Sequence, residues 1–437
     1  MRYRRTLVTI LALTFATAVR SEAQFYQDLS YPLSAEANAM GGAGAALVSD
    51  DPLASTLNPA QLGFSSLSGG LHVGVVPSLA SPNYYSPLYG GFWNLTGLSR
   101  AVAIDFGLPL NRVWNQLPSD ISIGVGYVNA RYAFDYFGLY PVQPTRGDYV
   151  NGISIGVGLK YLVKLGIGYA INPVSLSINP WPSPNGSVTA SATAQTIGAI
   201  LQIPVLDLMS KATRSPVLTS VGLRPVFNLT FGYSARNLGS HSYSGGAGLP
   251  EEADLAWNIQ LGLETRVGNH EWKWIAFNMI READASLLSL DSTLTVNPSN
   301  TLDSVYNHYY GTRKGIGGFH IYENLIAGKP TSLDHAIIDR PVGDIGVLKG
   351  AQIEFGQFIY LREGSVTEAG LPTYTTYGWG AKLDGLVKTL LFIHCLSPGN
   401  EIAKLLLDHF NLEFDYSKAN GGLFQGEPFE TLNLVLR

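Results

Sequence analysis

The feature that most constrains this chain is an apolar/polar alternation with a period of two residues. It is clearest in residues 100–108, 120–128, 225–236 and 254–266, where Ile, Val, Leu, Phe, Tyr or Trp occupies nearly every second position. Such a period is typical of β-strands that present one apolar face. No window after the first 23 residues reaches the roughly 18 consecutive apolar residues that a spanning helix needs. The sequence therefore predicts an all-β protein.

Alternation alone fits two architectures, a soluble sandwich with an apolar core and a transmembrane barrel with an apolar outside. Composition favours the barrel. Charged residues make up 14% of the chain, against about 25% in an ordinary soluble domain, and the faces opposite the apolar rows carry Gly and short polar residues. The expected fold is a monomeric transmembrane antiparallel β-barrel of about 14 strands. A secreted all-β protein remains the alternative.

Charged residues in the alternating segments predict which row faces the lumen. A Lys facing lipid at mid-depth would cost about 2–4 kcal/mol, so the row that carries the charges is expected to face inward. The expected lumen-facing polar residues are Asp105, Lys160, Lys164, Glu264 and Lys382.

The N-terminus reads as an export signal. Arg2, Arg4 and Arg5 precede the short apolar run Leu7–Val19, and Ser21 and Ala23 stand at the −3 and −1 positions of a cleavage site. Residues 1–23 are therefore expected to be a signal peptide. Together with the barrel, this signal predicts location in the outer membrane of a Gram-negative-type bacterium, in contact with its lipid.

Three segments are not assigned by the strand alternation alone. The alternation runs unbroken from Ile153 to Ile171, which fits either one long strand or a hairpin. Near the end of the chain, residues 386–392 are apolar and residues 398–410 carry apolar residues at helical spacing, and this helical part is expected to be a short amphipathic cap packed at the end of the barrel. Cys395, the only cysteine, lies in an apolar run and is expected to be inert packing.

Residues 34–63 carry a run of small residues and three short motifs. The motifs are Met40-Gly41-Gly42-Ala43-Gly44, Asp50-Asp51 and Asn58-Pro59-Ala60. This segment resembles the N-terminal signature of the FadL-like outer-membrane barrels, the superfamily of the long-chain fatty acid transporters, and more closely their PorV/PorQ branch. The stretches DGLVKTLLF and DHFNLEFDYSKANGGLFQGEPFETLNLVL near the end of the chain are also similar to that branch.

The resemblance implies that residues 24–69 form a plug, or hatch, inside a barrel made by residues 70–437. Glycine permits positive φ and close backbone approach, and proline fixes φ, so the segment suits an irregular plug in a polar lumen. The candidate ligand or plug residues are Gly41, Gly42, Gly44, Asp50, Asp51, Asn58, Pro59 and Ala60. A plug without any ligand role remains the alternative.

Motifs for catalysis are weak. Gly152–Gly156 matches the G-x-S-x-G pattern, but the alternation passes straight through it, so Ser154 reads as a strand residue and not as a nucleophile. The eight histidines lack metal-ligand spacing, and Asp50-Asp51 reads as a solvated turn or N-cap. With 33 acidic and 28 basic residues, nucleic-acid binding is not expected. The prediction is a non-enzymatic protein without cofactor or metal.

Two functions compete. The PorV/PorQ resemblance implies an accessory of protein secretion or surface attachment that works with a type IX-like secretion apparatus. The FadL-like resemblance implies passive transport of small hydrophobic compounds. Gln61 stands where the fatty acid transporters usually carry Gly, and this departure and the long connections between strands favour the first function.

Overall fold

The computed structural model describes most of the chain after the expected signal peptide, which lies outside the described residues. The described residues are 33–76, 83–86, 91–94, 100–112, 114, 120–137, 145–178, 188–213, 223–238, 252–267, 270–286, 345–367, 373–397, 399–420 and 428–436.

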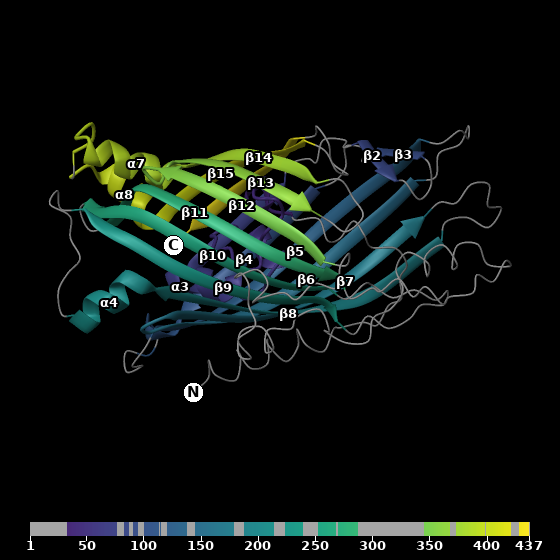
Figure 1. Cartoon of the computed structure of the whole chain (residues 1–437), viewed down its shortest axis with the longest axis horizontal. Coiled ribbons are helices and arrows are strands. Elements are labelled where there is room, and N and C mark those ends of the chain that lie inside the picture. Colours follow the sequence, from purple (N-terminus) through teal and green to yellow (C-terminus); the bar gives the residue numbers. More distant parts are fainter. Residues whose placement is uncertain are drawn as a thin grey trace, which may run out of the picture.

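Fourteen of the described strands close into one antiparallel barrel (Figure 1). They are β1 (Gly70–Val76), β4 (Arg100–Pro109), β5 (Asp120–Phe137), β6 (Thr145–Lys160), β7 (Lys164–Ile178), β8 (Val188–Pro204), β9 (Arg224–Leu238), β10 (Glu252–Val267), β11 (His270–Ser286), β12 (Ile345–Phe355), β13 (Ile359–Thr367), β14 (Tyr374–Lys382), β15 (Phe410–Asn420) and β16 (Pro428–Leu436). β1 pairs with β16 and β4, and the β5–β6 pairing completes the ring. The predicted strand number and closed architecture are confirmed.

Two short strands extend the sheet at one end. β2 (Asn83–Ser86) pairs with β3 (Gly91–Asn94), and β3 pairs with the end of β5. They lie at the end of the barrel opposite the helices, as Figure 1 shows.

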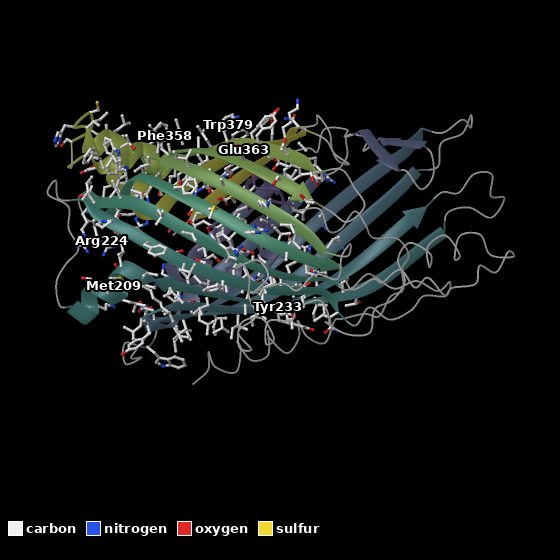
Figure 2. The ribbon with its side chains drawn as sticks, viewed as in Figure 1. Met209, Arg224, Tyr233, Phe358, Glu363 and Trp379 are labelled. Carbon is white, nitrogen blue, oxygen red and sulfur yellow. The ribbon has the colours of Figure 1, made fainter. Side chains whose placement is uncertain are left out.

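The apolar rows point outward. In β4, Ile104 and Phe106 are 40% and 53% exposed, whereas Ala103 and Asp105, which alternate with them, are buried. The aromatic side chain of Trp379 on β14 is likewise exposed on the wall (Figure 2). A soluble sandwich would bury the apolar row instead, so this arrangement is that of a lipid-facing wall.

At one turn and one bulge, the strands of the structure differ from what the period-two alternation alone indicates. Residues 153–171 form a hairpin, because β6 ends at Lys160 and β7 begins at Lys164 with matching parity. In β11 the register shifts opposite Leu263 and Glu264, so that the alternation changes phase near Trp274. This bulge hides β11 from a simple period-two reading.

One end of the barrel has the short connections and both termini of the ring. At this end, residues 161–163 join β6 to β7, and residues 356–358 join β12 to β13. At the opposite end, residues 287–344 join β11 to β12. Short turns mark the periplasmic end of such barrels. At this end lie α4 (Val205–Thr213), α7 (Leu383–Phe392) and α8 (Glu401–His409) (Figure 1).

The helices near the C-terminus were expected from their spacing, and both are confirmed. The expectation for Cys395 was wrong, because its side chain is exposed between α7 and α8. Among the described residues, no helix is long and apolar enough to cross a membrane.

The outward rows predict the effect of a single charge. Ile167 on β7 is 54% exposed on the outer face, and Lys there should lower barrel stability by about 2–4 kcal/mol because its ammonium would lie in hydrocarbon. The measurement is urea unfolding in lipid vesicles. The matched control is Tyr161→Lys in the periplasmic turn, where Tyr161 is 69% exposed. Equal stability of the two variants would contradict the assignment of the outer face.

Candidate functional site: the N-terminal segment inside the barrel

The N-terminal segment, here residues 33–69, is buried almost throughout. It contains α2 (Ala35–Ala39), the 3-10 helix η2 (Pro52–Thr56) and α3 (Gln61–Ser68). Ser34 caps α2 by accepting a hydrogen bond from the Ala37 N–H, and Gly69 ends α3 with a φ of 71°. α2 packs on β13 to β16, and α3 packs on β4 to β7. The segment therefore contacts separate parts of the inner wall.

The α3 half of the segment rests on glycines of the wall. A Cβ added at Gly124 would lie 2.6 Å from the Leu62 carbonyl oxygen, and one added at Gly156 would lie 2.6 Å from the Gly63 nitrogen. A Cβ at Gly158 would overlap the Gly63 carbonyl oxygen. Side chains at these wall positions would push the segment away. The glycine-rich inner rows seen in the sequence thus allow backbone to pack on backbone.

Asn58-Pro59-Ala60 connects the parts of the segment to each other and to the wall. The Asn58 side chain accepts from the Ala60 N–H (3.0 Å) and donates to the Ala45 carbonyl (2.7 Å) and the Tyr233 carbonyl (3.2 Å). Pro59 lies against Gly168 of β7. All hydrogen-bonding groups of the Asn58 amide are thus used within the protein, which gives this residue a structural task.

The glycine run also follows the wall. Gly41 and Gly42 have φ values of 73° and 80°, which only glycine adopts without strain. The Gly41 N–H donates to Thr376 Oγ1 (2.9 Å). The N–H groups of Gly44 and Ala45 both donate to Glu282 Oε2, at 2.8 and 2.7 Å. A carboxylate from β11 therefore holds this turn of the segment.

Asp50 and Asp51 lie at the start of η2. Asp51 caps η2, because its Oδ1 accepts from the Leu53 N–H at 2.9 Å. The N-cap reading is confirmed, but the expected solvation is wrong, since Asp51 is only 2% exposed. Burial raises the pKa of the Asp51 carboxyl to about 7, and the nearby carboxylates of Asp415 and Glu36 act in the same direction. The Asp50 carbonyl lies 3.3 Å from Nδ1 of His72 on β1.

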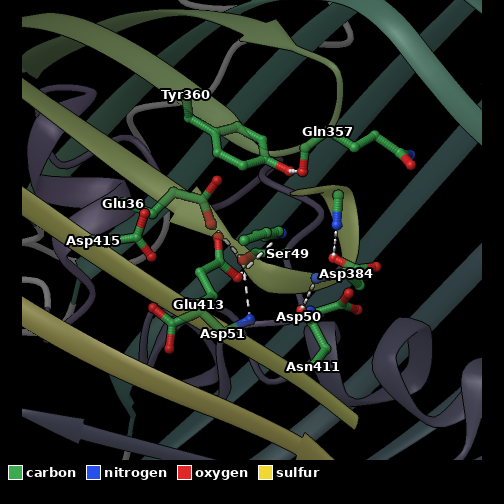
Figure 3. A network of polar contacts seen from close by, with 12 residues as sticks. Glu36, Ser49, Asp50, Asp51, Gln357, Tyr360, Asp384, Asn411, Glu413 and Asp415 are labelled. Atoms are coloured by element: carbon green, nitrogen blue, oxygen red, sulfur yellow. Dashed lines mark hydrogen bonds and ion pairs between the residues drawn. The ribbon is translucent and has the colours of Figure 1, made fainter. Parts of the chain in front are cut away.

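A buried ionic cluster ties α2 to the wall, and its carboxylates Glu36, Glu413 and Asp415 are labelled in Figure 3. Its centre is Arg362 of β13, whose side chain has no exposed surface. The guanidinium donates to Gln352 Oε1 (2.6 Å), to Glu36 Oε1 of α2 (3.1 Å) and to Asp415 Oδ1 of β15. Glu36 in turn accepts from Ser49 Oγ at 2.5 Å, and Ser49 Oγ accepts from the Asp51 N–H at 3.0 Å. The Arg362 side chain thus joins the N-terminal segment to β12 and β15.

A second cation completes the cluster. Lys382 Nζ lies 3.1 Å from Glu413 Oε2. Arg362 Cζ and Lys382 Nζ each lie 5.1 Å from the ring centroid of Tyr360, close enough for cation–π attraction. A buried charge without partners is strongly unfavourable, so these contacts depend on one another.

The five expected lumen residues occupy different settings. Asp105, Glu264 and Lys382 lie on the inner face, where Glu264 pairs with Arg224 and Lys382 with Glu413. Lys160 and Lys164 face each other at the periplasmic turn of β6 and β7, where Lys160 is exposed and Lys164 half-buried.

Sequence reasoning did not single out Arg362, Glu36, Asp415 or Glu282. Arg362 and Asp415 stand on the polar rows of their strands, so the alternation marks them as inward-facing. Their pairing depends on the order of strands around the ring. Among the described residues, no group of His, Cys, Asp and Glu is placed to hold a metal ion.

Comparisons with known proteins bear on the fold. No protein-family model matches the chain, and no curated protein matches it. Similar solved structures include the toluene transporter TbuX of Ralstonia pickettii (11% identity, 94% of this chain, 98% of that chain, TM-score 0.39). A FadL homologue of Pseudomonas aeruginosa is similar at 10% identity over 96% of this chain and 99% of that chain, with a TM-score of 0.38.

The similar structures also include barrels of another kind. The translocator domain of the autotransporter NalP from Neisseria meningitidis matches at 11% identity over 84% of this chain and 88% of that chain, with a TM-score of 0.35. Such distant likenesses carry no argument about function. The architecture of this chain rests on its own strand pairing.

The buried cluster predicts that Arg362→Met will release the N-terminal segment. The change leaves Glu36 and Asp415 as buried, unpaired carboxylates, a loss of about 3–5 kcal/mol. Amide hydrogen exchange of residues 35–47 in the folded barrel should rise strongly. Arg224→Met is the matched control, because Arg224 is a partly exposed arginine whose ion-pair partners Asp207, Glu264 and Glu271 all lie outside the N-terminal segment.

A further variant separates charge from packing. Combining Arg362→Met with Glu36→Gln and Asp415→Asn removes the unpaired charges and should restore much of the protection. If the single variant exchanged as slowly as the unaltered protein, the cluster would not hold the segment.

Proposed function

We propose that this chain is an outer-membrane barrel through which small hydrophobic compounds pass passively, with residues 24–69 as the plug that closes the path. The observation that carries the proposal is an apolar patch on the inner wall beside an interruption in the strand pairing.

The apolar patch combines the segment and the wall. Leu33, Ala35 and Leu53 of the N-terminal segment pack together with residues from β1, β4, β5 and β16. The wall residues are Val76, Ala101, Ala103, Val128, Ala130 and Phe429, with Val150 of β6 packed against them. These buried side chains pack on one another, so the contact between the segment and this part of the wall is apolar, and an apolar compound would bind here by displacing part of that contact.

The interruption lies between β6 and β7. Their pairing skips Asn151 and Gly152, opposite Asn172 and Pro173, although the register is the same on both sides. Proline has no N–H to donate to a ladder and is rare inside sheets. In a wall surrounded by lipid, each broken ladder bond is costly. The ladder bonds between β6 and β7 are already missing at this place, so the two strands can separate locally here by breaking fewer bonds than elsewhere.

The patch and the interruption touch each other. A Cβ added at Gly152 would lie 2.5 Å from Val128 Cγ1 of the patch. A compound held on the patch would therefore need only a local separation of β6 from β7 to leave through the wall. Displacement of the whole segment, with its glycine contacts and ionic cluster, would not be required.

The proposal predicts that a covalent link across the interruption will block uptake. In a Cys395→Ser background, Asn151→Cys with Pro173→Cys places two cysteines at facing positions of β6 and β7. Oxidation should reduce the uptake of radiolabelled toluene or a long-chain fatty acid into cells that express the barrel, and reduction should restore it. The matched control is Ile155→Cys with Tyr169→Cys, a facing pair in the uninterrupted part of the same two strands.

Uptake of both probes at the level of cells without the barrel would contradict transport. Equal loss of uptake with the link at the interruption and with the control link would contradict the proposed exit between β6 and β7.

A second candidate is the PorV/PorQ-type role, an accessory of protein secretion or surface attachment that works with a type IX-like apparatus. The observation that favours it is the close packing of the N-terminal segment on glycines and on Arg362, which suits a permanently closed barrel. Deleting the gene in its host and measuring surface delivery of exported proteins tests this role. Normal delivery together with reduced uptake would favour transport.

A further inference from the structure

The two helices between β14 and β15 form a small helical hairpin with its own core. Val387 of α7 packs with Ala403 and Leu407 of α8. Asn400 caps α8 by accepting from the Ala403 N–H at 3.0 Å. The hairpin is therefore a built element at the periplasmic rim, as Figure 1 shows for α7 and α8.

The end of α7 packs on aromatic side chains near the start of β11. Phe392, the last residue of α7, stacks on Trp272 with ring centroids 4.3 Å apart, and its ring is edge-on to Trp274 at 6.3 Å. Trp272 Nε1 donates to the Gly356 carbonyl at 2.9 Å. Trp274 remains 48% exposed on the wall. Aromatic residues in this position are typical of the girdle where a barrel wall meets the lipid headgroups.

The apolar wall reaches the seat of the hairpin. Phe355 and Ile359 flank the β12–β13 turn and are 41% and 36% exposed. α7 contacts this turn, because Thr389 Oγ1 donates to the Gly356 carbonyl at 3.1 Å and Lys388 Nζ donates to Gln357 Oε1 at 3.3 Å. The exposed side chains of Phe355 and Ile359 therefore flank a turn that α7 contacts.

The hairpin presents an uncovered apolar face of its own. Ile402 and Leu405 of α8 are 69% and 60% exposed, and Ile393 after α7 is 55% exposed. At 100° per residue, Ile402 and Leu405 lie on one side of α8, Ala403 and Leu407 on the packed side, and Lys404 on the polar remainder. In water, these three large aliphatic side chains would carry a free-energy cost proportional to the apolar area that they expose.

We propose that the α7–α8 hairpin is a membrane-interface anchor, which inserts Ile393, Ile402 and Leu405 into the phospholipids of the periplasmic leaflet. The occupant is lipid and not a protein partner, because the exposed face continues the lipid-facing wall through Phe392 and Trp274. A helix with one apolar and one charged side lies in the interface plane, with its apolar side about 5–10 Å deep. The anchor fixes the depth of the barrel end near β14 and β15.

The experiment measures the depth of single positions on α8. Cys395 is the only cysteine, so Cys395→Ser gives a background for Ile402→Cys and, as the matched control, Lys404→Cys. Each is labelled with the same small fluorophore and reconstituted in phosphatidylethanolamine/phosphatidylglycerol vesicles. The fluorescence is compared between vesicles with and without phospholipid brominated on the acyl chain near the headgroup. Heat-modifiable gel mobility verifies that both barrels are folded.

The expected result is roughly twofold stronger quenching by brominated lipid at position 402 than at position 404, because only the former faces acyl chains. Iodide in the water should quench the label at 404 more than the one at 402. Equal quenching by brominated lipid at both positions would overturn the proposal. So would a label at 402 that iodide reaches freely and brominated lipid does not. The result is independent of whether the barrel transports anything.

Discussion

Closure of the strand ladder is the constraint on which this structure depends. Lipid offers no partner for a backbone N–H or C=O group, so a sheet that spans a membrane must pair its first strand with its last. Here β1 joins β16 and β5 joins β6, which leaves no free edge in the ring. Closure also creates two surfaces with opposite requirements. The outer one must be apolar, and the inner one must be filled or hydrated.

The inner surface is filled by the chain's own N-terminal segment, in two different ways. Beside α3 the wall is reduced to glycine, and backbone packs on backbone. Beside α2 the contact is ionic, through Arg362, Glu36 and Asp415. The contacts at the glycines are close and involve no charges. A buried ion pair, by contrast, becomes strongly destabilising when either partner is removed, because the other charge is left buried and unpaired. The two halves of the segment therefore differ in what would loosen them.

The interruption lies between β6 and β7, whereas the apolar patch lies mainly on β1, β4, β5 and β16, with Val150 of β6 packed against it. The ionic cluster lies on β13 and β15, at another part of the ring. In the proposed transport, β6 would separate locally from β7 at Pro173 while Arg362 keeps α2 in place. The same arrangement is compatible with both proposed functions. A barrel that opens only at the interruption between β6 and β7 remains closed along its axis. The proposed lipid contact of the α7–α8 hairpin lies at the rim beside β14 and β15, far from that interruption along the ring.

The sequence by itself determined the strand class, the outward row and the inward row, because the period of two residues fixes which side chains share a face. It also indicated about 14 strands and the two rim helices. It left open whether residues 153–171 turn back, and it missed the phase change at the bulge of β11, since neither is a property of periodicity. Tertiary structure alone decided that Arg362, Glu36 and Asp415 meet. Arg362 and Asp415 meet because β13, β14 and β15 are neighbours in the sheet, and Glu36 reaches them because of the path of the segment inside the ring, which no local pattern encodes.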